Sequence, residues 1–78
     1  MSETGEAVVR MANQIARNLK ARGEDAAVAG TAEHIRLFWD PRMKEAAFNL
    51  LSEPDCGFSS LARAAIAHLA EEAGHRVA

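Results

Sequence analysis

The sequence contains few of the residues on which small proteins rely for covalent stability or for chemistry. Its 78 residues include one cysteine, two prolines, one tryptophan and no tyrosine. One cysteine excludes an internal disulfide, and the three histidines that could join it in a metal site show no recognised zinc spacing. A core of this size supplies no more than roughly 3–5 kcal/mol, so binding to a partner is a natural route to further stability.

Neither an excess of one charge nor a long apolar run is present. Nine basic residues stand against eleven acidic ones, a net charge of -2, whereas nucleic-acid binding favours a clustered basic excess. No apolar run approaches the ~20 residues that span a membrane. The first six residues are acidic and polar, unlike the basic start of a signal peptide. Together with the free cysteine, these features predict a cytoplasmic protein that binds neither nucleic acid nor membranes.

Motifs for catalysis are also missing. We find no glycine-rich phosphate loop, no paired-carboxylate motif and no nucleophile elbow. Cys56 could act as a nucleophile with a histidine as its base, but no helix N-terminus is expected beside it to activate the thiol. Ordinary surface or half-buried positions are the favoured interpretation for Cys56, His34, His68 and His75. We therefore expect no catalytic, cofactor-binding or metal-binding residue in this chain.

Four segments show the periodicity of amphipathic helices. They run from 6 to 22, from 25 to 38 or 39, from 41 to about 51, and from 59 or 60 to about 73. Gly23 and Gly74 are plausible helix stops, and residues 52–57 have the composition of a turn. The sequence therefore predicts an all-α protein, a small compact bundle of three to four short helices. We expect a single domain of residues 1–78, with frayed tails at 1–5 and 75–78.

The apolar side of each predicted helix defines the expected core. On the second helix, Gly30 and Leu37 fall on the outer side, away from the apolar stripe. On the first helix, the residues opposite the stripe are Arg10, Asn13, Arg17 and Lys20. The residues assigned to the core are Val8, Met11, Ala12, Ile15, Ala16, Leu19, Val28, Ala32, Ile35, Trp39, Met43, Ala46, Ala47, Leu50, Leu51, Ala62, Ala65, Ile66, Leu69 and Ala73.

Residues 34–43, with the sequence HIRLFWDPRM, form the most informative segment. Asp40 is a favoured N-cap and Pro41 a favoured first helical residue, so a helix should begin here. Trp39, at the preceding corner, is either a core anchor or a contact for another chain. Arg42 is either a solvated first-turn residue or, with Arg36, part of a subunit interface, since arginine and tryptophan are enriched in interface hot spots.

Three further apolar residues exceed what the core stripes require. They are Leu37, Phe38 and Phe48. A small monomer rarely leaves such residues together on its surface, so they favour a partner-binding patch. The alternative is that the helices bury wider faces than the stripes indicate. The hypothetical partner interface accordingly comprises Arg36, Leu37, Phe38, Trp39, Arg42 and Phe48.

Two motifs resemble those of a known family. MANQIA at 11–16, followed about twenty residues later by HIRLFWDPRM at 34–43, resembles the delta subunit of NAD-dependent formate dehydrogenase. The likeness extends from Val8 to about Leu69, and the loop from Glu53 to Phe58 departs from the plainer link expected there. The resemblance implies an accessory subunit without cofactors of its own that supports assembly or stability of a molybdenum- or tungsten-dependent enzyme.

The resemblance also implies what the partner subunits carry. The alpha subunit would hold the pterin-bound molybdenum or tungsten and iron–sulfur clusters, the beta subunit flavin and the NAD site, and the gamma subunit a further iron–sulfur cluster. The alpha subunit is the expected contact. Two alternatives stay open: a maturation factor that leaves the finished enzyme, and a helix-turn-helix regulator, which the acidic balance and Pro41 disfavour.

Overall fold

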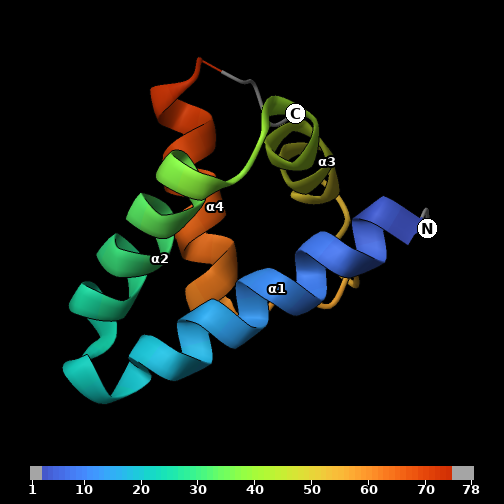
Figure 1. Cartoon of the computed structure of the whole chain (residues 1–78). Helices are drawn as coiled ribbons and strands as arrows, with labels where there is room; N and C mark the ends of the chain where they lie inside the picture. Colours follow the sequence, from blue (N-terminus) through green and yellow to red (C-terminus); the bar gives the residue numbers. More distant parts are fainter. Residues whose placement is uncertain (1–2, 75–78) are drawn as a thin grey trace.

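The computed structural model describes residues 3–74, which form four helices and one short 3-10 turn (Figure 1). These elements are α1 (Glu3–Leu19), η1 (Lys20–Arg22), α2 (Glu24–Phe38), α3 (Pro41–Leu50) and α4 (Ser60–Glu72). The described residues contain no strand, and the prediction of a small all-α bundle is confirmed. No helix within 3–74 combines the length and apolar character needed to cross a membrane.

The predicted N-terminal tail is shorter than expected. Residues 3–5 form the first turn of α1, and Gly5 is buried there. Glu3 and Glu6 suit this position because negative charge near a helix N-terminus is favourable. The remaining predicted tail residues, 1–2 and 75–78, lie outside the described part of the chain.

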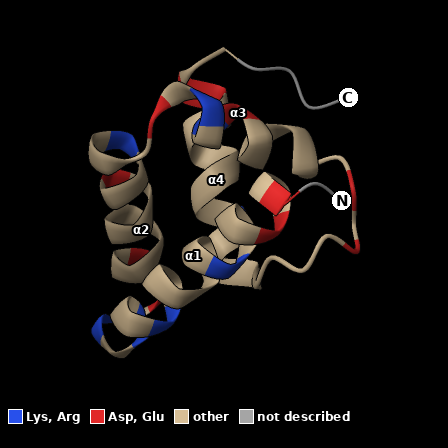
Figure 2. Ribbon diagram, turned by 45° about the vertical axis from the view of Figure 1, so that its right-hand side comes forward, with Lys and Arg blue, Asp and Glu red and all other residues tan. Residues whose placement is uncertain are grey.

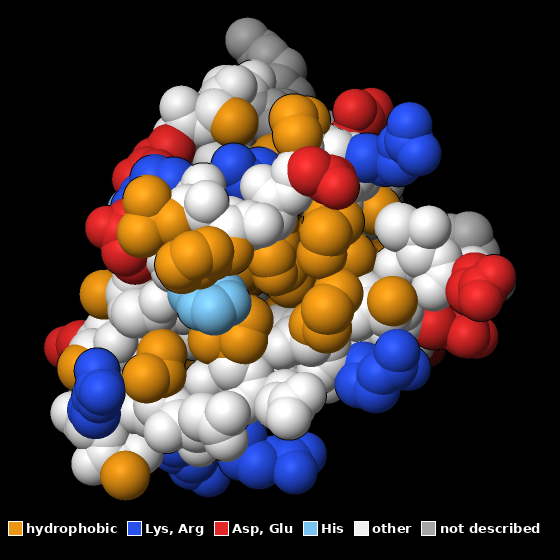
Figure 3. Space-filling model, in the orientation of Figure 1, with side chains coloured by type: hydrophobic (Ala, Val, Ile, Leu, Met, Phe, Trp, Pro, Cys, Tyr) orange, Lys and Arg blue, Asp and Glu red, His pale blue; other side chains and the backbone are white. Residues whose placement is uncertain are grey.

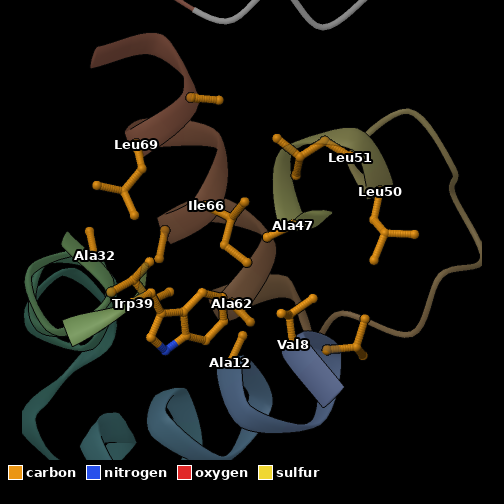
Figure 4. Close-up of a cluster of buried hydrophobic side chains, with 14 of the residues drawn as sticks. Val8, Ala12, Ala32, Trp39, Ala47, Leu50, Leu51, Ala62, Ile66 and Leu69 are labelled. Atoms are coloured by element: carbon orange, nitrogen blue, oxygen red, sulfur yellow. The ribbon is translucent and has the colours of Figure 1, made fainter. Parts of the chain in front are cut away.

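The core lies where α1 and α4 each pack against the other three helices. In Figure 1, α2 and α4 lie side by side and α1 crosses below both of them. The largest side chains with almost no exposure include Val8, Ile35 and Ile66. Many of the remaining core positions are alanines, which let the helix axes approach closely (Figure 4).

Three positions differ from the expected helix faces. Gly30 was expected on the outer side of α2, but an added Cβ there would lie 2.8 Å from Cδ1 of Leu19. Gly30 therefore faces α1, and its missing side chain makes room for Leu19. On α4, Ala70 is buried, whereas Ala73, which was expected in the core, follows the last helical residue, Glu72, and is exposed.

The helix ends follow the predicted caps. Gly23 and Gly74 adopt positive φ angles of 102° and 74°, a region that favours glycine. Asp40 precedes α3 in an extended conformation, and its Oδ1 accepts a hydrogen bond from the Met43 backbone N–H at 2.9 Å. Ser59 caps α4 in the same way through the Ala62 N–H. The predicted Asp40 cap is confirmed, and the fourth helix begins at Ser60, within the expected range.

Loss of the Asp40 cap should weaken the fold measurably. Asp40→Ala removes the acceptor of the Met43 N–H and should lower the free energy of unfolding by about 0.5–2 kcal/mol. Asp40→Asn keeps a side-chain oxygen in place and should be nearly neutral. Chemical denaturation of the three proteins measures both effects. Equal damage from asparagine and alanine would show that the carboxylate charge, rather than the capping bond, stabilises this corner.

Candidate protein interface

The corner between α2 and α3 directs neighbouring apolar side chains to opposite sides. α2 ends at Phe38, and Trp39 follows in an extended conformation with φ -85° and ψ 139°. The chain therefore turns Trp39 into the core, where it is 6% exposed. Leu37 and Phe38 stay on the last turn of α2 and are 66% and 71% exposed. Trp39 is thus a core anchor, and only its two predecessors remain available at the surface.

His34, one helical turn before Phe38, adds a second exposed ring beside it. The rings of His34 and Phe38 lie 4.9 Å apart between centroids and are inclined by 44°. Figure 3 shows apolar side chains gathered in a shallow hollow between α1, α2 and α3, with a histidine at its edge. We call His34, Leu37 and Phe38 the apolar corner. Such exposed apolar groups, when adjacent, are typical of binding sites.

Arg36, which was predicted at the interface, connects helices of this chain through its side chain. Its guanidinium donates to Glu33 on its own helix and, at 2.7 Å, to Glu72 at the end of α4. Lys44 of α3 adds a hydrogen bond from Nζ to the Arg36 carbonyl oxygen at 3.0 Å. These contacts link the ends of α2, α3 and α4 beside the apolar corner.

The Arg36–Glu72 contact shifts both groups toward their charged forms. The hydrogen bond from Arg36 lowers the pKa of Glu72, and the bonds to Glu72 and Glu33 raise the pKa of Arg36. Because the pKa of Glu72 is lowered in the folded state, its stabilising effect is present above the ordinary carboxyl pKa. The effect is lost as the pH falls through the lowered value. Both side chains are exposed, so the contribution is small.

The other predicted interface residues are not gathered at the corner. Phe48 was predicted outside the core stripe of its helix. In the structure it is half-buried and packs against the core. It lines a cavity of about 260 Å³ together with Arg36, Lys44, Leu69, Glu72 and Ala73. Arg42 is exposed in the first turn of α3 and forms no ion pair with residues 3–74. Of the apolar residues in the predicted patch, only Leu37 and Phe38 are exposed, and the ring of His34 lies beside Phe38.

Asn13, in the middle of the MANQIA motif, holds the loop before α4. Its Nδ2 donates to the Gly57 carbonyl at 2.9 Å, and its Oδ1 accepts from the Ser59 N–H at 2.8 Å. Asn13 was expected opposite the apolar stripe of its helix, and the loop before α4 returns over α1 at this position. Both polar atoms of the side chain thus fix the start of α4.

Arg63 secures the same loop from the other side. It donates to the carbonyl oxygens of Leu51 and Glu53, at 2.9 and 3.0 Å, and to Sγ of Cys56 at 3.2 Å. Cys56 itself is buried. Cys56 therefore belongs to a hydrogen-bond network that holds the loop from Glu53 to Phe58. This is the loop in which the sequence departs from the pattern expected for the family.

No metal-binding cluster of three or more acidic, histidine or cysteine residues occurs within residues 3–74. His34 and His68 lie exposed on different helices, and His68 pairs with Glu72 at 3.2 Å. His75, the third candidate ligand, lies outside the described residues.

Comparison with known proteins agrees with the two motifs. No curated protein and no solved structure matches the chain. Residues 7–66 match the family described as NADH-dependent formate dehydrogenase delta subunit, FdsD. The matched region includes Asn13, the Asp40–Pro41 cap and the apolar corner, and it covers well over half of the chain. The chain therefore belongs to the family of delta subunits of NADH-dependent formate dehydrogenase.

Proposed function

We propose that this chain is a non-catalytic subunit that supports assembly or stability of a formate dehydrogenase complex by docking through its apolar corner. The observation that carries the proposal is the exposure of Leu37 and Phe38, at 66% and 71%, whereas the other large apolar side chains within residues 3–74 are buried or half-buried. Membership of the delta-subunit family supports it, since a delta subunit implies partner subunits.

The alpha subunit is the partner that we propose for the apolar corner. In the family, the alpha subunit is expected to hold the pterin-bound molybdenum or tungsten and iron–sulfur clusters, while flavin is expected in beta. The complex as a whole would be cytoplasmic. Of the residues considered for chemistry, Cys56 accepts a hydrogen bond from Arg63, and His68 pairs with Glu72. We therefore assign this chain no catalytic step.

Co-purification distinguishes a permanent subunit from a maturation factor. We expect an affinity-tagged chain, expressed with the other subunits, to purify with active enzyme at a fixed stoichiometry through size exclusion. A tagged alpha subunit should recover the same complex in the reverse direction. If the chain is found only with inactive or cofactor-free alpha subunit and leaves the mature enzyme, it is a maturation factor. Failure to purify with any of the subunits would refute the proposed function.

A further inference from the structure

The basic residues of this chain divide into two groups by their contacts. Arg36, Lys44 and Arg63 each hold the fold together through ion pairs or hydrogen bonds to carbonyl oxygens. A second group forms no ion pair or side-chain hydrogen bond with residues 3–74. Apart from Arg42, this second group comprises Arg10, Arg17, Lys20 and Arg22, and we call these four residues the basic face.

The basic face is continuous along α1 and η1. Residues 7–23 contain these four cations and no acidic residue. At 100° and 1.5 Å per residue, Arg10 and Arg17 lie within about 20° of one another over a length of about 10 Å on α1, and Lys20 and Arg22 follow in η1. All four are exposed. Figure 2 shows the positive charge on α1 and on the turn that follows it. Glu6 and Glu24 lie just beyond its two ends.

A hollow lies beside the middle of the basic face. It has a volume of about 320 Å³ between α1 and the start of α4, and its lining includes Arg17, Lys20, Glu24, Ser59 and Ser60. Two cations and two hydroxyl groups therefore border a space large enough for a side chain, with one carboxylate among them. A surface of this kind complements an acidic side chain on a partner better than an apolar or basic one.

We infer that the basic face docks against an acidic surface of a formate dehydrogenase subunit, an inference that rests on the proposed function but concerns a different face of the chain. The isolated protein carries a net charge of -2, so this clustering of cations is not a consequence of overall basicity. Unpaired cations in one arc repel one another, and an acidic partner surface relieves that repulsion. The chain would then contact the complex through an apolar corner and a separate electrostatic face.

Salt dependence separates the two contacts. We would immobilise the chain and measure binding of the other subunits, expressed together without it, at roughly 0.1 M and 1 M salt, where the Debye length is about 10 and 3 Å. The wild-type chain should bind more weakly at the higher salt. Arg10→Gln/Arg17→Gln should weaken binding about 2- to 30-fold at the lower salt and should reduce the salt dependence.

Two control variants complete the design. Leu37→Ala should weaken binding at both salt concentrations while leaving the salt dependence at its wild-type value. Asn49→Glu, at an exposed position on α3 that belongs neither to the basic face nor to the lining of the hollow, changes the net charge elsewhere and should bind as the wild type does. The far-ultraviolet circular dichroism of every variant should match the wild type, because the altered side chains are exposed.

The outcomes separate the inference from the proposed function. Binding that does not depend on salt, or a double arginine variant with wild-type salt dependence, overturns the basic face while leaving the apolar corner in place. If Leu37→Ala binds the other subunits as the wild type does while the double arginine variant binds more weakly, the apolar corner is overturned and the basic face is supported. Absence of binding under both conditions refutes both proposals.

Discussion

Replacing Trp39 with alanine is expected to unfold most of the protein. The indole is the largest side chain in the core, and Figure 4 shows it between Ala32 of α2, Ala12 of α1 and Ala62 of α4. Its removal leaves a cavity among small neighbours that cannot fill it, at a cost of about 3–5 kcal/mol. A core of this size provides only roughly that much stability in total. Thermal unfolding followed by circular dichroism should therefore show a lost or strongly lowered transition.

The neighbouring aromatic residue provides the matched control. Phe38→Ala removes a ring that is 71% exposed, so it should change the free energy of unfolding by no more than about 0.5 kcal/mol. Trp39→Phe should fall between the two, since it keeps part of the apolar volume. An unchanged midpoint for Trp39→Ala would contradict the structure. Trp39 would then belong to the partner interface, the alternative that the sequence left open.

The helices were predictable because their signals are local. The stripe of α1, the Asp40–Pro41 pair and the serine before α4 are each contained within one or two turns of chain. Periodicity and capping act over the same distance, so both could be read without knowing the tertiary structure. The prediction that Leu37 lies opposite its helix's apolar stripe succeeded for the same reason.

The failures share a different cause, which is packing between distant segments. Asn13 is bonded to Gly57 and Ser59, across a separation of 44 and 46 residues, so its own helix gave no sign of that contact. Phe48 is half-buried because α3 packs against both α1 and α4, which widens its buried face beyond the predicted stripe. A stripe indicates the direction of burial but not its width. Phe48 was therefore counted among the surplus apolar residues, although packing against other helices half-buries it.

The second large effect is expected from a substitution in the apolar corner, which should impair assembly of the complex and leave folding unchanged. Leu37→Glu should leave the circular dichroism spectrum and thermal midpoint of the isolated chain unchanged, because this side chain is 66% exposed and glutamate is a good helix former. In the complex, the same carboxylate would lie in a desolvated interface at a cost of several kcal/mol. Each loss of about 1.4 kcal/mol in binding free energy raises Kd tenfold, so binding should weaken by roughly a hundredfold or more.

A pull-down of the other formate dehydrogenase subunits with the tagged variant measures this loss. Asn49→Glu carries the same new charge on an exposed position of α3, outside the apolar corner and the basic face, and should be recovered in the complex at the wild-type stoichiometry. If a folded Leu37→Glu chain also enters the complex at that stoichiometry, the apolar corner is not the docking surface, and the basic face becomes the leading candidate. Loss of the folded state in Leu37→Glu would instead contradict its exposure on α2. The combination of an unchanged fold and a lost partner is specific to a docking residue, because a core residue would lose both.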